Sequence, residues 1–328
     1  MTIKFNNVYV ENVSTVAGPF VIEGPLKDNF DKKFTDFYDG EKTFEKCEMK
    51  ELKESIKILL DKTKYNEEDI SFGISADLMN QLTISNFVYS KLNIPFLGVY
   101  NACASVCEEI LIAASILENE KNKKAICTTS SHNMTSERQF RNPVEYGAPK
   151  PKTTTFTVTG AASLMLTNAK TDIKVTSATI GKVIDMGVDN VFDMGAVMSP
   201  SAAYTLNEHL KQTKTKVSDY DLILTGDLGV YGKDIFKEIC EKEYNIKLDK
   251  NYDDTATMIY DYKENIYAGG SGPSCMPLVV YSSIIPQMKQ RIIKKVLLIA
   301  TGALMSPTTC NQKFSIPSVS HAVCLEVI

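Results

Sequence analysis

The chain contains 328 residues, of which 44% are hydrophobic and 23% charged, and its formal net charge is −4. This composition is typical of a globular protein with one large domain or two small ones. The acidic balance excludes a protein that binds nucleic acid through a basic surface, so we expect no nucleic-acid partner. No run approaches the roughly 18 to 20 apolar residues of a membrane-spanning helix, and we predict none.

The N-terminal segment and the cysteines bear on the compartment. The segment MTIKFNNVYVEN has no continuous apolar stretch, so we predict no secretory signal and a cytoplasmic protein. Eight cysteines are scattered along the chain, and in a reducing compartment we expect no disulfide framework. Cys127 and Cys324 lie in apolar, strand-like runs, where a free cysteine behaves as a small hydrophobic residue. With three histidines and no CxxC pair, we expect no zinc site.

The first half of the chain alternates helical and strand patterns. Residues 48–64 place Leu52, Ile56 and Leu59 at helical spacing, and an apolar strand is predicted over residues 70–76. The segments that follow in order are NACASVCEEILIAASIL, NKKAICTTSSHNM and the strand-like GAASLMLTNA. This alternation favours an α/β fold.

The second half repeats this plan. LNEHLKQTKTKVSDYDLILTGDLG precedes AGGSGPSCMPLVVYSSIIPQM, and then come IKKVLLIATGALMS and a final strand, HAVCLEVI. The central strand ends in SADL in the first half and in TGDL in the second. A duplicated α/β unit explains this order most simply. We therefore predict two halves, residues 1–172 and 173–328, that pack into one layered α-β-α-β-α body.

Several motifs carry a family resemblance. The NACAS turn, the GGSGPS loop and the late TGALMSP turn resemble the thiolase fold of ketoacyl synthases. A longer set resembles the stage V sporulation protein AD family, namely TSSHNMTSERQFRNPVEYG, TVTGAASLML, ATIGKVIDMGV, FDMGAVMSPSAA, YDLILTGDLG and YAGGSG.

The resemblance has implications for ligand and partners. It implies binding of dipicolinic acid, which spores store with calcium, and a role in moving this compound into the forming spore. It also implies partnership with the SpoVA membrane proteins, and a place in the forespore at the periphery of the inner membrane. Enzymes of this fold usually form homodimers, which we therefore expect here as well. Calcium enters only as part of the ligand, and we expect no other cofactor.

Cys103 is the candidate nucleophile, because it stands where a strand-like approach meets the start of a helix. A helix N-terminus lowers the pKa of a thiol, which suits a nucleophile that accepts an acyl group. In ketoacyl synthases, a His, or a His and an Asn, from loops of the second half activates this cysteine. Here those loops offer Gly226 or Asp227 in one case and Gly270 in the other. We therefore predict that Cys103 lines a ligand pocket and that no residue is catalytic.

Two other readings stay open. An active acyltransferase or thiolase-like enzyme would use Cys103 as its nucleophile. A scaffold would dock membrane proteins without binding a ligand.

Further residues are candidates for the ligand pocket. His132 follows a strand and could donate to a carboxylate. Arg138 could bind a carboxylate in the forked manner of arginine, although Arg138 and Arg141 could instead pair with Glu137 or Glu145 and brace the loop.

Acidic and glycine-rich segments complete the candidate site. Asp77 either approaches a ligand through bridging calcium or caps a turn, and for Asp227 we favour the turn or cap. In AGGSG, the backbone amides of Gly270, Ser271 and Gly272 could bind a carboxylate.

Overall fold

The computed structural model describes residues 1–141, 150–261 and 266–328. In the first half, the strands are β1 (Thr2–Lys4), β2 (Tyr9–Ala17), β3 (Lys32–Lys33), β4 (Phe72–Ala76), β5 (Phe96–Gly98), β6 (Lys124–Ser131), β7 (Phe156–Thr157) and β8 (Gly160–Thr167). The helices of this half are α1 (Phe44–Thr63), α2 (Thr83–Tyr89), α3 (Ser105–Leu117) and α4 (Asn133–Phe140).

The second half has a similar succession of elements. Its strands are β9 (Ile173–Thr179), β10 (Leu222–Thr225), β11 (Tyr252–Asp254), β12 (Gly270–Ser271), β13 (Lys295–Ala303) and β14 (Ser318–Val327). Its helices are α5 (Met194–Thr213), α6 (Gly229–Tyr244), α7 (Ala256–Ile259), α8 (Cys275–Val279), α9 (Ile285–Lys289) and α10 (Pro307–Asn311). A π-helical turn, Val280–Ile284, joins α8 to α9.

Most strands belong to one sheet that runs through both halves. Its order is β11-β10-β13-β14-β9-β2-β8-β6-β4-β5, with β1 added to β9 and β3 to β2. The two halves meet where β2 pairs with β9 over only two residue pairs, Tyr9 with Lys174 and Val10 with Ile173. A separate small sheet pairs β12 with β7, so the glycine-rich loop of the second half is attached to the first half.

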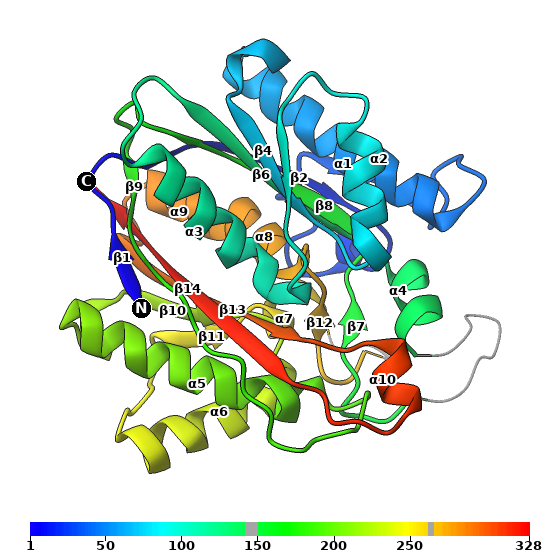
Figure 1. The fold of residues 1–328 in the computed structure, drawn as a ribbon, viewed down its shortest axis with the longest axis vertical. Coiled ribbons are helices and arrows are strands. Elements are labelled where there is room, and N and C mark those ends of the chain that lie inside the picture. Colours follow the sequence, from blue (N-terminus) through cyan, green and yellow to red (C-terminus); the bar gives the residue numbers. More distant parts are fainter. Residues whose placement is uncertain (142–149, 262–265) are drawn as a thin grey trace.

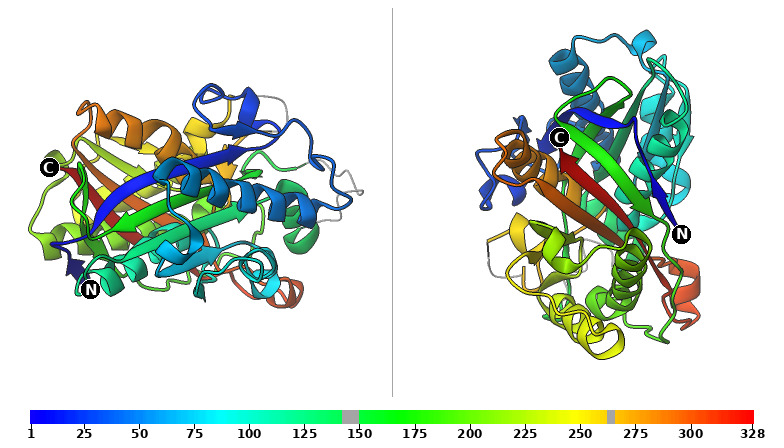
Figure 2. Two further views of the ribbon diagram at one scale, coloured as in Figure 1. Left: turned by 90° about the horizontal axis from the view of Figure 1, so that it is seen from above. Right: turned by 90° about the vertical axis from the view of Figure 1, so that its left-hand side faces the viewer.

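The helices form layers on both faces of this sheet. Helix α1 covers β2 and β8 on one outer side, and α5 covers β13 and β14 on the other. Helix α3 contacts strands of both halves and lies between them, next to α8 and α9, as Figures 1 and 2 show. This arrangement confirms the layered α/β fold. The division at residue 172 stays a prediction.

Local sequence explains where the main elements begin. Thr43 caps α1 by accepting a hydrogen bond from the Lys46 amide at 3.3 Å, so this helix begins earlier than the apolar spacing predicted. Central helix α3 is apolar over most of its surface, and Val106, Ile110 and Leu117 are buried in the largest core cluster. All eight cysteines are free, and Cys127 and Cys324 are buried in strands as the sequence predicted.

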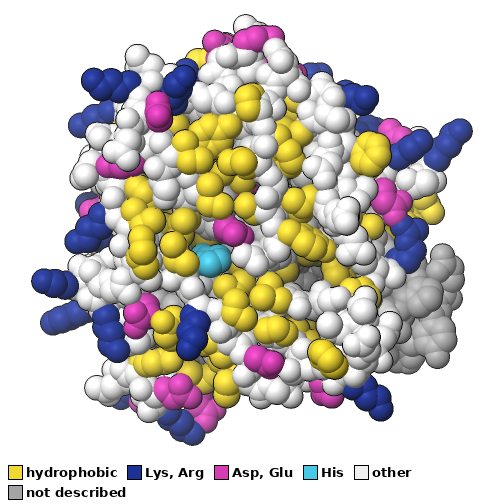
Figure 3. All heavy atoms as spheres, viewed as in Figure 1, with side chains coloured by type: hydrophobic (Ala, Val, Ile, Leu, Met, Phe, Trp, Pro, Cys, Tyr) yellow, Lys and Arg dark blue, Asp and Glu magenta, His cyan; other side chains and the backbone are white. Residues whose placement is uncertain are grey.

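Membrane-spanning potential and surface composition can be read from the described residues. No helix in the described ranges combines the length and the apolar character needed to cross a bilayer. Figure 3 shows hydrophobic side chains gathered across the middle of one face, over α3 and β14, with lysines and arginines mainly around its edge.

Candidate functional site

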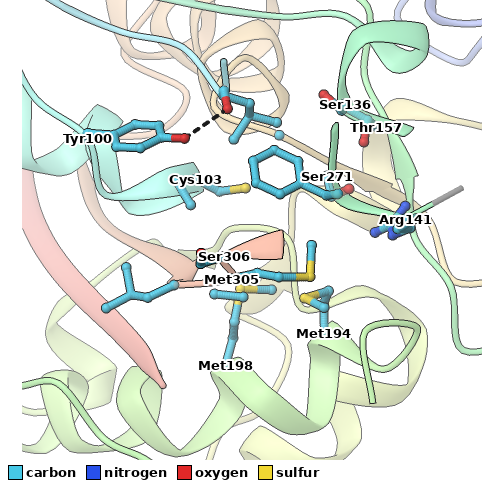
Figure 4. Close-up of a pocket in the computed structure, with 16 residues that line it drawn as sticks. Tyr100, Cys103, Ser136, Arg141, Thr157, Met194, Met198, Ser271, Met305 and Ser306 are labelled. Atoms are coloured by element: carbon cyan, nitrogen blue, oxygen red, sulfur yellow. Dashed lines mark hydrogen bonds between the residues drawn. The ribbon is translucent and has the colours of Figure 1, made fainter. Parts of the chain in front are cut away.

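A cavity of about 270 Å³ lies where the two halves of the chain meet (Figure 4). The first half contributes Leu78, Tyr100, Ala102, Cys103, Ser136, Phe140, Arg141 and Thr157. The second half contributes Met194, Met198, Ser271, Gly272, Ala303, Leu304, Met305 and Ser306. Most of these side chains are apolar, so the few polar groups among them decide what the cavity can bind.

The turn before α3 presents Cys103 to this cavity. Ala102 has a positive φ of 49°, which turns the chain sharply between β5 and the helix. The turn is fixed from two sides. The Asn101 amide donates to Ser105 Oγ at 3.1 Å, and a Cβ on Gly302 would lie 2.3 Å from the Asn101 carbonyl oxygen. The prediction that Cys103 lines a pocket agrees with this placement.

The electrostatics of Cys103 are opposite to those expected for a nucleophile. Burial raises the pKa of the Cys103 thiol well above its usual range, and the charge and hydrogen bonding of Asp227 raise it further. The Gly272 amide and Arg141 act in the other direction but do not prevail. The lowered pKa expected from the helix N-terminus is therefore wrong for this site, and Cys103 is a neutral thiol near pH 7.

Asp227 contacts two residues of the cavity, Cys103 and Gly272, without lining it, so the expectation of a turn or cap does not describe its position. Its Oδ2 accepts the Gly272 amide at 2.8 Å, while Oδ1 has no nitrogen or oxygen partner among the described residues. Burial raises the pKa of the Asp227 carboxyl to about 8, although the thiols of Cys103 and Cys275 partly oppose this by hydrogen bonding. Asp227 is therefore mainly protonated at neutral pH.

The turn around residues 226–229 is held by a different acid, Asp254. Its carboxylate accepts hydrogen bonds from Thr225 Oγ1 at 2.6 Å, the Leu228 amide at 3.2 Å and the Gly229 amide at 3.1 Å. Because Asp254 satisfies these donors, Asp227 is free to face Cys103.

Arg141, not Arg138, is the cation of the cavity. Its side chain is 7% exposed, and its Nη1 donates to Glu137 Oε1 at 2.6 Å. Its Nε is buried without a hydrogen-bond partner among the described residues, and so is the Ser136 hydroxyl. Figure 4 shows both residues on the side of the cavity away from Tyr100. Two unpaired polar groups in an apolar cavity favour an anionic ligand.

The predicted loop brace is present beside this site. Glu137 pairs with Arg141 and also, at 3.0 Å, with Lys150. The alternative brace partner, Glu145, lies outside the described residues. Arg138 forms an ion pair with Glu45, is half exposed and does not line the cavity. The ligand role predicted for Arg138 therefore suits Arg141, three residues later, instead.

His132 also lies away from the cavity lining. It is fully buried and caps α4, where Nδ1 accepts the Met134 amide at 3.3 Å and Nε2 lies 3.0 Å from the Phe37 carbonyl oxygen. Burial lowers the pKa of His132 to about 4, so the ring is neutral at pH 7. The prediction that it donates to a bound carboxylate is not supported by this position.

Asp77 serves as a turn and helix cap. Its Oδ1 accepts the Met79 amide at 2.9 Å, and its Oδ2 accepts both the amide and the hydroxyl of Ser85, at 2.8 and 2.7 Å. Of the two roles left open for Asp77, the structure supports the cap, and the neighbouring Leu78 lines the cavity instead.

Residues of the glycine-rich loop have two roles: some line the cavity and one packs tightly against α7. Ser271 and Gly272 line the cavity, whereas Gly270 packs so closely that a Cβ there would lie 2.5 Å from Ile259 Cγ2. Gly272 has a φ of +107°, a conformation that favours glycine, and its amide is already used by Asp227. A ligand carboxylate therefore does not find the Gly272 amide free.

Residues that the sequence interpretation missed form the apolar wall of the cavity. Met194 and Met198 lie one turn apart on α5, and Met305 follows β13. Tyr100 closes another side and donates its hydroxyl to the Leu78 carbonyl at 3.1 Å. The FDMGAVMSP segment contains the signal for two of them, because its methionines are four residues apart, which is about one turn of a helix.

Among the described residues that line the cavity, none is a base that could activate the thiol. None of the three histidines lines the cavity. His209 Nε2 lies 3.0 Å from the Tyr220 hydroxyl, and His321 Nδ1 accepts the Gly181 amide at 3.1 Å. The arrangement can hold a small anion against apolar walls, but a proton acceptor for Cys103 is not among the groups that line it.

Comparison with solved structures defines the class of fold. An OleA variant from Xanthomonas campestris matches with a TM-score of 0.62 and 13% identity, over 99% of this chain and 99% of that one. The 3-oxoacyl-[acyl-carrier-protein] synthase III of Aquifex aeolicus matches with a TM-score of 0.58 and 12% identity, over 97% of this chain and 99% of that one. The chain therefore has a thiolase-like fold.

Sequence comparison identifies the family within this fold. The model of the Stage V sporulation protein AD (SpoVAD) family matches residues 1–326. Stage V sporulation protein AD of Bacillus subtilis (strain 168) is 40% identical over 319 residues, which cover 97% of this chain and 94% of that protein. The chain belongs to the SpoVAD family of sporulation proteins.

Proposed function

We propose that this protein binds dipicolinic acid in the cavity beside Cys103 and does not transform it. The observation that carries the proposal is that Arg141 Nε and the Ser136 hydroxyl have no hydrogen-bond partner among the described residues and lie in a mainly apolar cavity. A planar pyridine ring suits the methionine and aromatic walls, and a carboxylate suits the arginine. The volume of about 270 Å³ limits the ligand to a small molecule.

The state of Cys103 supports binding without chemistry. An acyl transfer would need the thiolate, but burial and Asp227 keep the thiol protonated. Asp227, whose carboxyl is itself largely protonated, is a poor proton acceptor at neutral pH. The inherited nucleophile position therefore serves as part of the pocket wall.

Titration calorimetry with dipicolinate tests this proposal. The wild-type protein should give saturable heat, and Arg141→Met should weaken binding about ten- to a hundredfold, because a hydrogen bond to a charged group contributes about 1.5 to 3 kcal/mol. Arg138→Met is the matched control, since Arg138 lies in the last turn of α4, three residues before Arg141, and outside the cavity. An absence of saturable heat, or equal losses in both variants, would contradict the proposal.

Calcium is proposed to enter only together with the ligand. None of the described residues that line the cavity is Asp or Glu, and the same part of the chain has no cluster of acids, cysteines and histidines that could hold a metal ion. Calcium alone should therefore give no saturable heat in the same calorimeter, and tight binding of calcium alone would show that the protein has its own site.

The acyltransferase alternative rests on Cys103 in the cavity and on a fold shared with a synthase. It predicts a covalent acyl adduct on Cys103 after incubation with acyl-CoA. We expect intact mass spectrometry to show an unchanged mass across short and long acyl chains, and an adduct that is lost in Cys103→Ala would support the alternative instead.

We further propose partnership with the SpoVA membrane proteins at the spore inner membrane, which membership of the SpoVAD family supports. A pull-down with these subunits should retain the variant Cys103→Trp, whose indole fills the cavity. Retained docking together with lost dipicolinate binding would separate the two roles, and lost docking of this folded variant would show that they share a surface.

A further inference from the structure

A second concavity lies away from the cavity beside Cys103. It is a groove of about 870 Å³ formed by the C-terminal ends of α5 and α6 and by the segments that follow them. Figure 1 shows these two helices side by side at the lower edge of the molecule. Met198 of α5 lines the cavity and Asn207 of α5 lines the groove, so about nine residues, or about 14 Å of helix, separate them.

The groove has a basic rim. Its lining includes four lysines, Lys211, Lys216, Lys247 and Lys250, and one acid, Asp249. Lys247 lies 3.6 Å from Glu241, whereas the other three lysines form no ion pair with any residue in the described ranges. This concentration of unpaired cations is notable in a chain whose net charge is −4, and it suits an anionic partner.

Between the lysines, the groove is lined by apolar side chains and by polar ones, among them Asn207, Thr215 and Asn251. Leu210 is buried, and Val217, Tyr244 and Ile246 are half-buried beside it. Asn207 is only 5% exposed, yet its side-chain amide makes no hydrogen bond to a described residue. The amide is therefore free to form hydrogen bonds with an occupant of the groove.

These features together define the chemistry of an occupant. An Asn side chain offers one carbonyl and one NH₂ group, which match the NH and C=O of a peptide unit. The apolar floor suits alternate side chains of an extended segment, and the lysine rim suits its acidic side chains. A flat bilayer cannot reach the floor of a concave groove, so a lipid surface fits this arrangement less well.

We propose that the groove between the C-terminal ends of α5 and α6 docks an extended, acidic segment of a partner protein, with Asn207 paired to its backbone and Lys211, Lys216 and Lys250 to its carboxylates. This proposal is independent of dipicolinate binding. The groove and the cavity share only helix α5, so either site can fail in an experiment without the other.

Fluorescence polarisation with a labelled peptide of alternating Glu and Leu tests this proposal on the whole chain. We expect saturable binding that weakens about tenfold or more in Lys211→Glu/Lys250→Glu and falls with added salt. The matched control is Lys121→Glu/Lys123→Glu, which changes net charge equally on exposed residues outside the groove. Failure to saturate, or equal weakening in the control pair, would overturn the proposal.

Two further arms identify what is recognised. Asn207→Leu should weaken binding of the same peptide about tenfold, because it replaces the amide by an apolar side chain of similar size. Unchanged affinity would refute the pairing of Asn207 with a peptide backbone. A Lys-Leu peptide should not bind, and equal binding of it would refute the charge complementarity. If phosphatidylglycerol vesicles bind with the same dependence on Lys211 and Lys250 while the acidic peptide does not, the surface is a lipid site and the proposal is wrong.

Discussion

At Cys103, two influences on one thiol act in opposite directions. The start of a helix favours the thiolate, but this effect is worth only about 0.3 to 1 kcal/mol at an ordinary site. Burial can shift a pKa by several units, and here it acts together with a carboxyl group rather than a histidine. The larger effect prevails, so the same turn that presents a nucleophile in an enzyme presents a neutral side chain here.

Replacing Asp227 should release part of this suppression. Above pH 8 the Asp227 carboxylate is ionised and raises the pKa of Cys103. Asp227→Asn should therefore lower the pKa of Cys103 and speed its alkylation by iodoacetamide about tenfold for each unit by which that pKa falls. Peptide mass spectrometry at pH 8.5 gives the rate at Cys103, with the half-buried Cys310 as internal reference. Equal rates in wild type and variant would show that Asp227 does not control the thiol.

At the scale of elements, helix α1 buries two carboxyl groups against the sheet. Glu48 accepts from Ser130 Oγ at 2.9 Å and from Thr135 Oγ1 at 3.0 Å. Neither carboxyl oxygen of Glu51 has a hydrogen-bond partner among the described residues. Burial raises the pKa of Glu51 well above its usual range, and nearby Glu48 adds to this, so the folded protein holds Glu51 in its protonated form.

This burial predicts a loss of stability as pH rises. The unfolded chain releases the Glu51 proton above about pH 4.3, while the folded state keeps it, so the free energy of unfolding decreases from there through the raised folded pKa. Glu51→Gln should therefore raise the free energy of unfolding at pH 8 by more than about 1 kcal/mol and change it less at pH 4.5.

Urea unfolding at the two pH values measures this difference. Glu54→Gln is the control, because Glu54 pairs with Lys32 and its pKa is lowered, so its removal should not stabilise the protein at pH 8. Equal effects of both substitutions would refute the role of the buried Glu51 carboxyl.

At the scale of the whole molecule, strand β5 forms one end of the large sheet. Among the described strands it pairs only with β4, so its outer backbone groups are free for another strand. Leu97 in β5 and Tyr100 just after it are each 46% exposed. A second copy that pairs through this edge would cover both residues, which is in keeping with the homodimer expected from the family resemblance.

Light scattering after size exclusion checks the assembly. We expect twice the 36.4 kDa chain mass for the wild type and the single chain mass for Leu97→Glu, because a charge on a strand edge opposes pairing. Ile292→Glu is the matched control, since Ile292 is 65% exposed and lies outside β5. A monomeric wild type, or dissociation by both substitutions, would contradict this interface.

The sequence determined much of the fold by itself. The spacing of apolar residues in segments such as residues 48–64 and 105–117 reflects local periodicity, and the repeated order of segments reflects the duplicated α/β plan. The NACAS turn also placed Cys103 correctly, because a strand that ends where a helix begins is a local feature. Membership of the SpoVAD family came from long motifs in order.

Only the tertiary structure decided which polar groups face the cavity. Arg138 and Arg141 are three residues apart, and which one points inward depends on how the short helix α4 docks on the sheet. Asp227 meets Cys103 because the sheet order brings together turns that are 124 positions apart in the sequence numbering, 103 and 227. His132 follows the strand as predicted, yet its ring turns towards Phe37 and α1. Local pattern fixes the position of a residue along an element, whereas the direction of its side chain and the partner it meets depend on packing between distant segments.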